Sequence, residues 1–288
     1  MTLRRVPFAV RLRVPVGDVV ERRGWLLGGP AGWGELSPLP SWSDAERAAA
    51  ERAAVEAASS PFPAPARARV EVNALIPRVS PEEAAALAVA SGCRTVKVKV
   101  GDGPGLDRAR AVRAALGPSF RLRLDANGSW PDADAAARSL AAFEPLDVEL
   151  VEDPVGSMEE LADVRRRTSI PVGAEMCVRT IEDARRLGRL DAADAVVLKP
   201  QRMGGVRAAL AAAEAAGVPA IASSALETSV GLAAVLALAA ALPGAPFAHG
   251  VGTALLLERD VTADPLLPEA GSLRPRRVAP DLLEQAGA

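Results

Sequence analysis

Cysteine, histidine and tyrosine are scarce in this chain of 288 residues, which contains two cysteines, one histidine and no tyrosine. Cys93 and Cys177 form neither a C-x-x-C pair nor a zinc-ligand spacing, which argues against a disulfide-stapled fold and a cysteine-bound zinc site. Two lone thiols in a long chain are typical of a reducing compartment. We therefore expect a cytoplasmic protein whose cysteines pack as small hydrophobic side chains.

Long apolar runs are also missing. The most apolar segment, Val230 to Leu242, is shorter than the roughly 20 residues that a membrane-spanning helix needs, and it predicts a buried helix. Arg11 and Arg13 interrupt the apolar start of the chain, which lacks the layout of a signal peptide. Basic and acidic residues nearly balance, at 34 and 36, so nothing indicates nucleic acid or an anionic membrane as a partner. A small molecule is the expected partner, and the oligomeric state stays open.

The first part of the chain has the pattern of a small α+β unit. Residues 7–34 alternate apolar and polar side chains around a Gly-Gly-Pro turn, which predicts antiparallel strands. Ser43 and Glu46 form a capping box that predicts a helix to about Ala58. The proline-rich stretch 59–65 has the composition of a linker.

From Arg69 onward, strand patterns alternate with helix patterns, which predicts βα units around a parallel sheet. Helix starts are marked by a capping residue followed three residues later by an acid, at Ser80, Ser157 and Thr180. Eight stretches favour strands: 70–75, 95–100, 120–124, 148–151, 171–174, 195–198, 219–222 and 247–248. Eight strands predict a (β/α) barrel. A doubly wound sheet, the alternative, would need a glycine-rich phosphate loop after its first strand, and none follows.

The two patterns divide the chain into two expected domains. We expect residues 1–65 to form a capping domain and residues 66–259 to form the barrel. The tail from about 260 to 288 is expected to pack back on the capping domain.

Two lysines, Lys97 and Lys99, lie in a β-branched run that favours a strand. Because side chains alternate along a strand, both lysines share one face. In a parallel sheet covered by helices both faces are buried, so two ammonium groups there need carboxylate or ligand partners. A solvated edge strand is the ordinary explanation of an isolated K-x-K, and the residues downstream argue against it.

The carboxyl ends of three further predicted strands carry one carboxylate each, from Asp125, Glu152 and Glu175. Lys199 stands at the end of the strand that follows them. Each carboxylate alone could be a turn or surface residue, but charges at five consecutive strand ends favour a site, because barrel enzymes place their chemistry there. Three carboxylates without histidine or cysteine suit Mg²⁺ and argue against zinc.

This layout suits the removal of a proton next to a carboxylate. A lysine that acts as a base must lose its proton near neutral pH, which burial beside a second cation favours, and Lys99 beside Lys97 is so placed. The negative charge that develops on the substrate carboxylate would be met by the divalent ion and by Lys199.

Five motifs in order resemble the enolase superfamily, in its muconate-lactonizing branch: K-V-K at 97–99, L-D-A-N-G at 124–128, V-E-D-P at 151–154, P-V-G-A-E at 171–175 and V-L-K-P at 197–200. A lysine base with Mg²⁺ is the pattern of that superfamily. The resemblance covers nearly the whole chain and implies an α/β fold, a modified TIM barrel of (β/α)7β type with an N-terminal α+β capping domain. Segments 32–40 and 223–232 further resemble the o-succinylbenzoate synthase subgroup.

The resemblance implies a role for ten residues. Lys99 would be the base and Lys199 the opposing cation; Asp125, Glu152 and Glu175 would bind Mg²⁺, for which Mn²⁺ can substitute; Lys97, Arg123, Asn127, Ser223 and Gly250 would line the substrate site.

Two positions depart from the family pattern. The usual third-ligand motif is Asp-Glu-Ser, whereas Glu175 is followed here by Met176 and Cys177, so the longer glutamate would have to reach the ion from a strand end that retreats slightly. Asp153 or Glu149 would be the next candidates for this role. The only histidine, His249, is not where racemases of the family carry a catalytic His-Asp pair, and we expect it to be structural.

The subgroup implies the Mg²⁺-dependent dehydration of 2-succinyl-6-hydroxy-2,4-cyclohexadiene-1-carboxylate to o-succinylbenzoate, a step of menaquinone biosynthesis. Lys99 would remove the proton next to the ring carboxylate and then protonate the departing hydroxyl on the same face. An N-succinylamino acid racemase, with Lys99 and Lys199 as bases on opposite faces, stays open as an alternative or a second activity. A dipeptide epimerase fits less well, because residues 247–255 lack an Asp-x-Asp motif. A non-catalytic scaffold is disfavoured, because every carboxylate and lysine of the pattern is retained.

Overall fold

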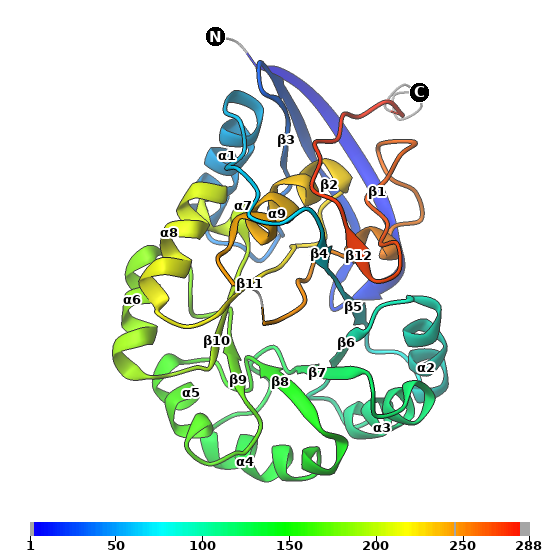
Figure 1. Ribbon diagram of the computed structural model, residues 1–288, viewed down its shortest axis with the longest axis vertical. Helices are drawn as coiled ribbons and strands as arrows, with labels where there is room; N and C mark the ends of the chain where they lie inside the picture. The colour runs from blue at the N-terminus through cyan, green and yellow to red at the C-terminus, as the bar shows by residue number, and fades with distance from the viewer. Residues whose placement is uncertain (1–2, 245, 283–288) are drawn as a thin grey trace.

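The computed structural model describes residues 3–244 and 246–282. Its N-terminal part, blue in Figure 1, is an antiparallel sheet in the order β1-β2-β3 with one helix against it. These elements are β1 (Arg4–Val16), β2 (Val19–Gly29), β3 (Gly32–Leu36) and α1 (Asp44–Ser59). Buried and exposed residues alternate along β1 because one face of the sheet packs inward. The predicted small α+β unit is confirmed, including the capping box between Ser43 and Glu46.

The rest of the chain forms a curled parallel sheet in the order β11-β10-β9-β8-β7-β6-β5, and Figure 1 shows it as a ring with helices outside. The strands are β5 (Asn73–Ile76), β6 (Thr95–Lys99), β7 (Arg121–Asp125), β8 (Val148–Glu152), β9 (Val172–Ala174), β10 (Ala195–Leu198) and β11 (Ala220–Ala222). The helices are α2 (Pro81–Ala90), α3 (Gly105–Leu116), α4 (Ala133–Ala141), α5 (Met158–Arg165), α6 (Ile181–Leu190), α7 (Pro200–Met203), α8 (Val206–Ala216) and α9 (Ser229–Ala241), with short 3₁₀ turns at Glu144–Leu146 and Thr253–Leu256. The predicted barrel-type α/β fold is confirmed.

The ring closes differently from the prediction. Residues 247–248 form no strand; instead His249 bridges Val72 and Gly250 bridges Ser223, both in parallel. The predicted strand 70–75 is divided into two, because β4 (Val70–Glu71) pairs antiparallel with β12 (Ser272–Leu273) while β5 continues into the barrel. The chain changes its pairing partner at Val72, and this change depends on the distant C-terminal strand β12.

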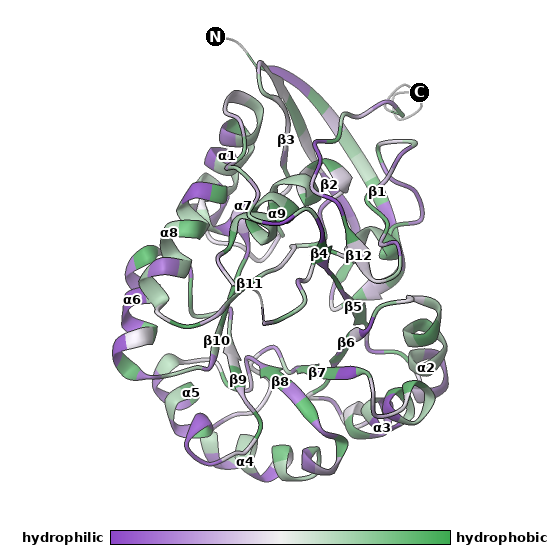
Figure 2. Ribbon diagram, viewed as in Figure 1, coloured by the Kyte–Doolittle hydropathy of each residue, from purple (hydrophilic) through white to green (hydrophobic). Residues whose placement is uncertain are grey.

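The helices begin where the capping residues predicted. Ser80, Ser157 and Thr180 each accept a hydrogen bond from the backbone N–H three residues later. The hydrophilic residues of α6, purple in Figure 2, are mostly exposed, whereas α9 is buried along most of its length, as predicted for residues 230–242. In the described part of the chain, no helix combines the length and the hydrophobicity needed to cross a bilayer.

The C-terminal segment contacts the N-terminal part. The Arg277 guanidinium donates to the carbonyl oxygens of Ala57 and Ser60, each at 2.7 Å. The same guanidinium lies 3.9 Å from the centre of the Phe62 ring. The domain boundaries at residues 65 and 259 stay a prediction, and residues 283–288 of the tail lie outside the described residues.

Candidate active site

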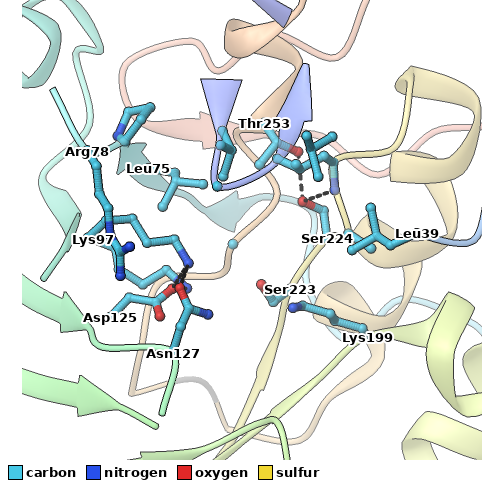
Figure 3. A pocket seen from close by; sticks show the side chains of 18 of the residues that line it. Leu39, Leu75, Arg78, Lys97, Asp125, Asn127, Lys199, Ser223, Ser224 and Thr253 are labelled. Atoms are coloured by element: carbon cyan, nitrogen blue, oxygen red, sulfur yellow. Dashed lines mark hydrogen bonds and ion pairs between the residues drawn. The ribbon is translucent and has the colours of Figure 1, made fainter. Parts of the chain in front are cut away.

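A cavity of about 580 Å³ lies where the β1–β2 turn of the N-terminal sheet meets the carboxyl ends of the barrel strands. Figure 3 shows Lys97, Asp125 and Asn127 on one side of it and Lys199 and Ser223 on the other. Seven of the ten predicted site residues line the cavity: Lys97, Lys99, Asp125, Asn127, Lys199, Ser223 and Gly250. At Gly250 a Cβ atom would come within 2.7 Å of the Ser223 hydroxyl oxygen, so a glycine lets these two chain segments approach closely.

The two lysines of β6 share one face and meet carboxylates, as the strand pattern predicts. The register places Lys99 opposite Asp125, and both ammonium groups lie 2.9 Å from Asp125 Oδ2. Lys97 Nζ also lies 2.8 Å from Glu152 Oε2, and Lys99 donates to Asn127 Oδ1. Burial lowers the pKa of Lys97, but Asp125 and Glu152 outweigh it and leave that pKa above its ordinary value.

Asp125 and Glu152 end adjacent strands in register, and both carboxyl groups are buried. Burial opposes ionisation of Asp125, yet Lys97 and Lys99 hold its pKa below the ordinary value. Burial raises the pKa of Glu152 despite the Lys97 ammonium. Asp125 Oδ1 is buried and has no hydrogen-bond partner in the described residues. An unpartnered buried carboxylate oxygen beside a second carboxylate is a suitable ligand for a hard divalent cation.

Glu175, directly after β9, is buried between two cations. Its Oε2 lies 2.5 Å from Lys199 Nζ and its Oε1 lies 2.5 Å from Arg202 Nη1. Burial raises the pKa of Glu175, but Lys199 and Arg202 outweigh it and leave that pKa below its ordinary value. Arg202 is not among the site residues predicted from the sequence, although its position three residues after Lys199 was a usable signal. In the structure it lies on the short helix α7. Arg202 also binds Glu46 of α1 at 2.6 Å and so joins the site to the N-terminal part.

Asp153 is a further carboxylate of the site, and it belongs, where Asp125 does not, to the group that could hold a metal ion. Oxygens of Glu152, Asp153 and Glu175 lie within 4.8 Å of one another and could hold a metal ion. Asp153 Oδ1 accepts the backbone N–H of Glu175 at 2.8 Å, so this carboxylate fixes the start of the loop after β9. Glu149, the other candidate considered for the third ligand, instead binds Arg123 at 2.5 Å.

Arg123 does not line the cavity, although the sequence placed it in the substrate site. Its guanidinium is buried, pairs with Glu149 and donates to the carbonyl oxygen of Ala248 at 2.8 Å. His249 is buried nearby and accepts the backbone N–H of Ala222 at its Nδ1. Burial, then the cations Arg67 and Arg123, lower the pKa of His249 to about 3, and the neutral ring is part of the barrel interior.

A second buried polar cluster joins the two parts of the molecule beside the cavity. Glu35 of β3 accepts the backbone N–H groups of Thr228 at 3.0 Å and Gly231 at 3.1 Å, at the start of α9. Arg22 of β2 donates to the carbonyl oxygen of Leu226, which lines the cavity. A Cβ atom at Gly231 would lie 2.9 Å from Glu35 Oε2, so a glycine is needed for this approach.

The titration of Glu35 predicts a pH-dependent stability. Burial, and then the neighbouring Glu227 carboxyl group, raise the pKa of Glu35 from 4.5 to about 7. The folded chain therefore binds this proton more tightly than the unfolded chain, and the stabilisation present below pH 4.5 is lost as the pH rises through 7. We expect the free energy of unfolding to fall by up to about 3 kcal/mol across this range, and the Glu35→Gln variant to lack that part of the decline. Urea unfolding of both proteins at pH 5 and pH 8 measures the difference; equal declines would show that Glu35 does not titrate in this range.

Comparisons with known proteins agree with this geometry. The Enolase C-terminal domain-like family matches residues 80–280, and the Enolase N-terminal domain-like family matches residues 4–58. The o-succinylbenzoate synthase of Thermobifida fusca (strain YX) is 50% identical over 283 residues, which cover 96% of this chain and 88% of that protein. The o-succinylbenzoate synthase of Mycobacterium ulcerans (strain Agy99) is 40% identical over 280 residues, covering 95% of this chain and 84% of that protein.

Solved structures show the same fold at lower identity. The L-Ala-D/L-Glu epimerase from Bacillus subtilis superposes with a TM-score of 0.84 at 24% identity, over 98% of this chain and 97% of that one. The N-succinyl Arg/Lys racemase from Bacillus cereus ATCC 14579 superposes with a TM-score of 0.82 at 18% identity, over 98% of this chain and 95% of that one. The fold is therefore shared by proteins whose named activities differ.

Proposed function

The chain belongs to the enolase superfamily, and on that premise we propose that it catalyses the Mg²⁺-dependent dehydration of 2-succinyl-6-hydroxy-2,4-cyclohexadiene-1-carboxylate to o-succinylbenzoate. The observation that carries the proposal is the 50% identity to an o-succinylbenzoate synthase along 96% of the chain. The site supports it, because lysines lie on opposite sides of a cavity that Asp125 lines, and Lys97 and Lys199 pair with the buried Glu152 and Glu175. We also propose a cytoplasmic location and no nucleic-acid partner.

Asp125, Glu152 and Glu175 are the proposed ligands of the metal ion, with Mn²⁺ as a substitute for Mg²⁺. The ion would stabilise the negative charge that develops on the substrate carboxylate. The fit rests on the unpartnered buried oxygen of Asp125 and on a donor set made only of carboxylates, which hard divalent cations prefer.

Lys99 is the proposed base. It lies beside Asp125 and Asn127 on one side of the cavity, where its Nζ would take the proton next to the ring carboxylate. The C–H electron pair becomes the new double bond and the C–O bond to the hydroxyl group breaks. Lys99 then returns its proton to the departing hydroxyl, so the products are water and the aromatic ring.

Lys199 is the proposed opposing cation. It lies across the cavity from Asp125 and Asn127 (Figure 3), and its Nζ is paired with Glu175 at 2.5 Å. Lys97, Asn127, Ser223 and Gly250 are the proposed substrate contacts, because they line the cavity. Arg123 does not line the cavity and would affect the substrate only through the residues that do.

The racemisation of N-succinylamino acids is the second candidate function. The fold shared with an N-succinyl Arg/Lys racemase and the lysines on opposite sides of the cavity favour it. We expect purified protein with Mg²⁺ to convert the cyclohexadiene acid with a kcat/KM well above that for any N-succinylamino acid. Parallel assays of both substrates measure this ratio, and a protein that only racemises would overturn the proposal.

The Glu175→Gln variant tests the third ligand, where the sequence departs from its family. A neutral amide replaces one of three anions, so we expect Mg²⁺ affinity to fall by about 10-fold or more. Mutations of outer-shell residues already lower metal affinity by roughly 10-fold or more. Calorimetric titration with Mg²⁺ measures the affinity. An unchanged affinity would move the role to Asp153, whose oxygens lie in the same group.

A further inference from the structure

The cavity contains one basic side chain whose charge no described carboxylate offsets. Four basic residues of the described chain line it, and three of them are the lysines. Lys97 and Lys99 pair with Asp125, and Lys199 pairs with Glu175. Arg78, the fourth, forms no ion pair within residues 3–244 and 246–282. Its free positive charge is the feature that neither the metal nor the two catalytic lysines explain.

Arg78 is held at the cavity wall with most of its donors available. It lies in the loop between β5 and α2, at the carboxyl end of the first barrel strand, and is exposed to solvent. One nitrogen, Nη2, donates to the carbonyl oxygen of Val100 at 3.3 Å, whereas Nε and Nη1 have no hydrogen-bond partner among the described residues. Figure 3 shows Arg78 on the same side of the cavity as Lys97, above Asp125.

The wall near Arg78 contains apolar side chains. Leu75 lies on β5, three residues before Arg78, and Leu39 lies across the cavity in Figure 3. Leu226 also lines the cavity. A ligand could place one anionic end at the metal ion proposed for the strand-end carboxylates and a second anionic end at Arg78. With an apolar middle, such a ligand would match this distribution. Asp18, exposed in the β1–β2 turn, also lines the cavity, and its negative charge disfavours placing the second anion there.

We propose that Arg78 binds the succinyl carboxylate of the substrate and thereby selects ligands with a second, distal carboxylate. The inference rests on the proposed function, in which the ring carboxylate is bound at the metal. The succinyl chain ends in a carboxylate that would be costly to bury without a cation. A guanidinium can bind a carboxylate through two parallel hydrogen bonds, and a lysine cannot. N-Succinylamino acids carry the same tail, so Arg78 would serve either activity.

The test compares two ligands that differ only in the distal group. o-Succinylbenzoate has the second carboxylate, and 2-butanoylbenzoate has a methyl group in its place. Calorimetric titration in the presence of Mg²⁺ should show that the wild-type protein binds o-succinylbenzoate about 10-fold or more tightly than 2-butanoylbenzoate, as expected for a charge-assisted pair. In Arg78→Gln this preference should vanish through weaker binding of o-succinylbenzoate alone, and Arg78→Lys should restore part of it.

Arg110→Gln is the matched control, because Arg110 is exposed on α3 and, among the described residues, pairs only with Asp107. It should keep the wild-type preference, and thermal unfolding verifies that every variant is folded. In steady-state assays Arg78→Gln should raise KM about 10-fold while changing kcat little, because the distal contact is the same before and during reaction. An Arg78→Gln protein that keeps the preference, or that binds both ligands more weakly by the same factor, would overturn the proposal. So would a wild-type protein that binds the two equally or binds neither.

This result is separate from the test of the proposed function. Ligand binding needs no turnover, so a protein that prefers the dicarboxylate through Arg78 yet fails to dehydrate the cyclohexadiene acid would overturn the function and leave the role of Arg78 in place. A protein that dehydrates the acid without using Arg78 would do the reverse.

Discussion

The Lys99→Arg variant is expected to lose dehydration by about 10²- to 10⁴-fold in kcat, the range that general acid–base catalysis contributes. In the wild-type protein Lys99 Nζ lies 2.9 Å from Asp125 Oδ2. Arginine keeps a positive charge near this carboxylate, so the local charge balance is preserved. The guanidinium has a very high pKa and cannot take up the substrate proton. In a same-face elimination one lysine performs both proton transfers, so nothing else in the site replaces Lys99.

The Lys199→Arg variant is the paired comparison. In the proposed elimination Lys199 supplies only a positive charge, so this variant should retain partial dehydration where the longer guanidinium fits beside Glu175. Initial rates at saturating substrate and Mg²⁺ measure both variants. If Lys99→Arg dehydrates normally while Lys199→Arg is inactive, the base is on the opposite side of the barrel from the one proposed.

The same pair separates elimination from racemisation. Each lysine must exchange a proton with one enantiomer in a racemase. In deuterated water, Lys199→Arg should incorporate deuterium into one enantiomer of an N-succinylamino acid through Lys99, without forming the other enantiomer. Deuterium exchange followed by NMR detects this. Incorporation into both enantiomers would contradict the assignment of the two faces.

Asp125→Asn and Glu152→Gln should each sharply weaken Mg²⁺ binding, the second large effect that we expect. Each change replaces a proposed anionic ligand by a neutral amide of the same shape, and we expect Mg²⁺ affinity to fall by at least about 100-fold, since outer-shell changes alone cost roughly 10- to 100-fold. Dehydration should fall with it. The fold should survive, because the two proposed ligands stand at strand ends of a formed barrel.

Calorimetric titration with Mg²⁺ and circular dichroism measure these two outcomes. Glu182→Gln is the control, since Glu182 is exposed on α6, lies outside the proposed ligand set and pairs with Arg185 and Arg189. It should bind Mg²⁺ as the wild type does. Unchanged Mg²⁺ affinity in Asp125→Asn would remove Asp125 from the ligand set.

The strand periodicity predicted much of the site. Lys97 and Lys99 had to share a face, and the parallel register then brings Lys99 opposite Asp125 and Asp125 opposite Glu152. These relations follow from alternation along strands and from the meeting of parallel strand ends at one edge. The roles assigned to these residues stay predictions.

Other features depend on packing between distant segments. Glu35 accepts hydrogen bonds from Thr228, 193 residues away, and no local pattern fixes which loop meets the N-terminal sheet. The division of the first barrel strand depends on β12 near the C-terminus. Arg78 lies in an exposed loop, where a lone arginine has no periodic signal, and its importance appears only when the pairing of the three cavity lysines is known.

Direct turnover by the purified wild-type protein tests the central claim. The protein is incubated with the cyclohexadiene acid and Mg²⁺, and o-succinylbenzoate is quantified by chromatography, with and without an excess of chelator. We predict stoichiometric conversion that stops with the chelator and returns on addition of Mg²⁺. Conversion that continues at full rate in protein verified to be free of metal, or no conversion with Mg²⁺ present, would contradict the account.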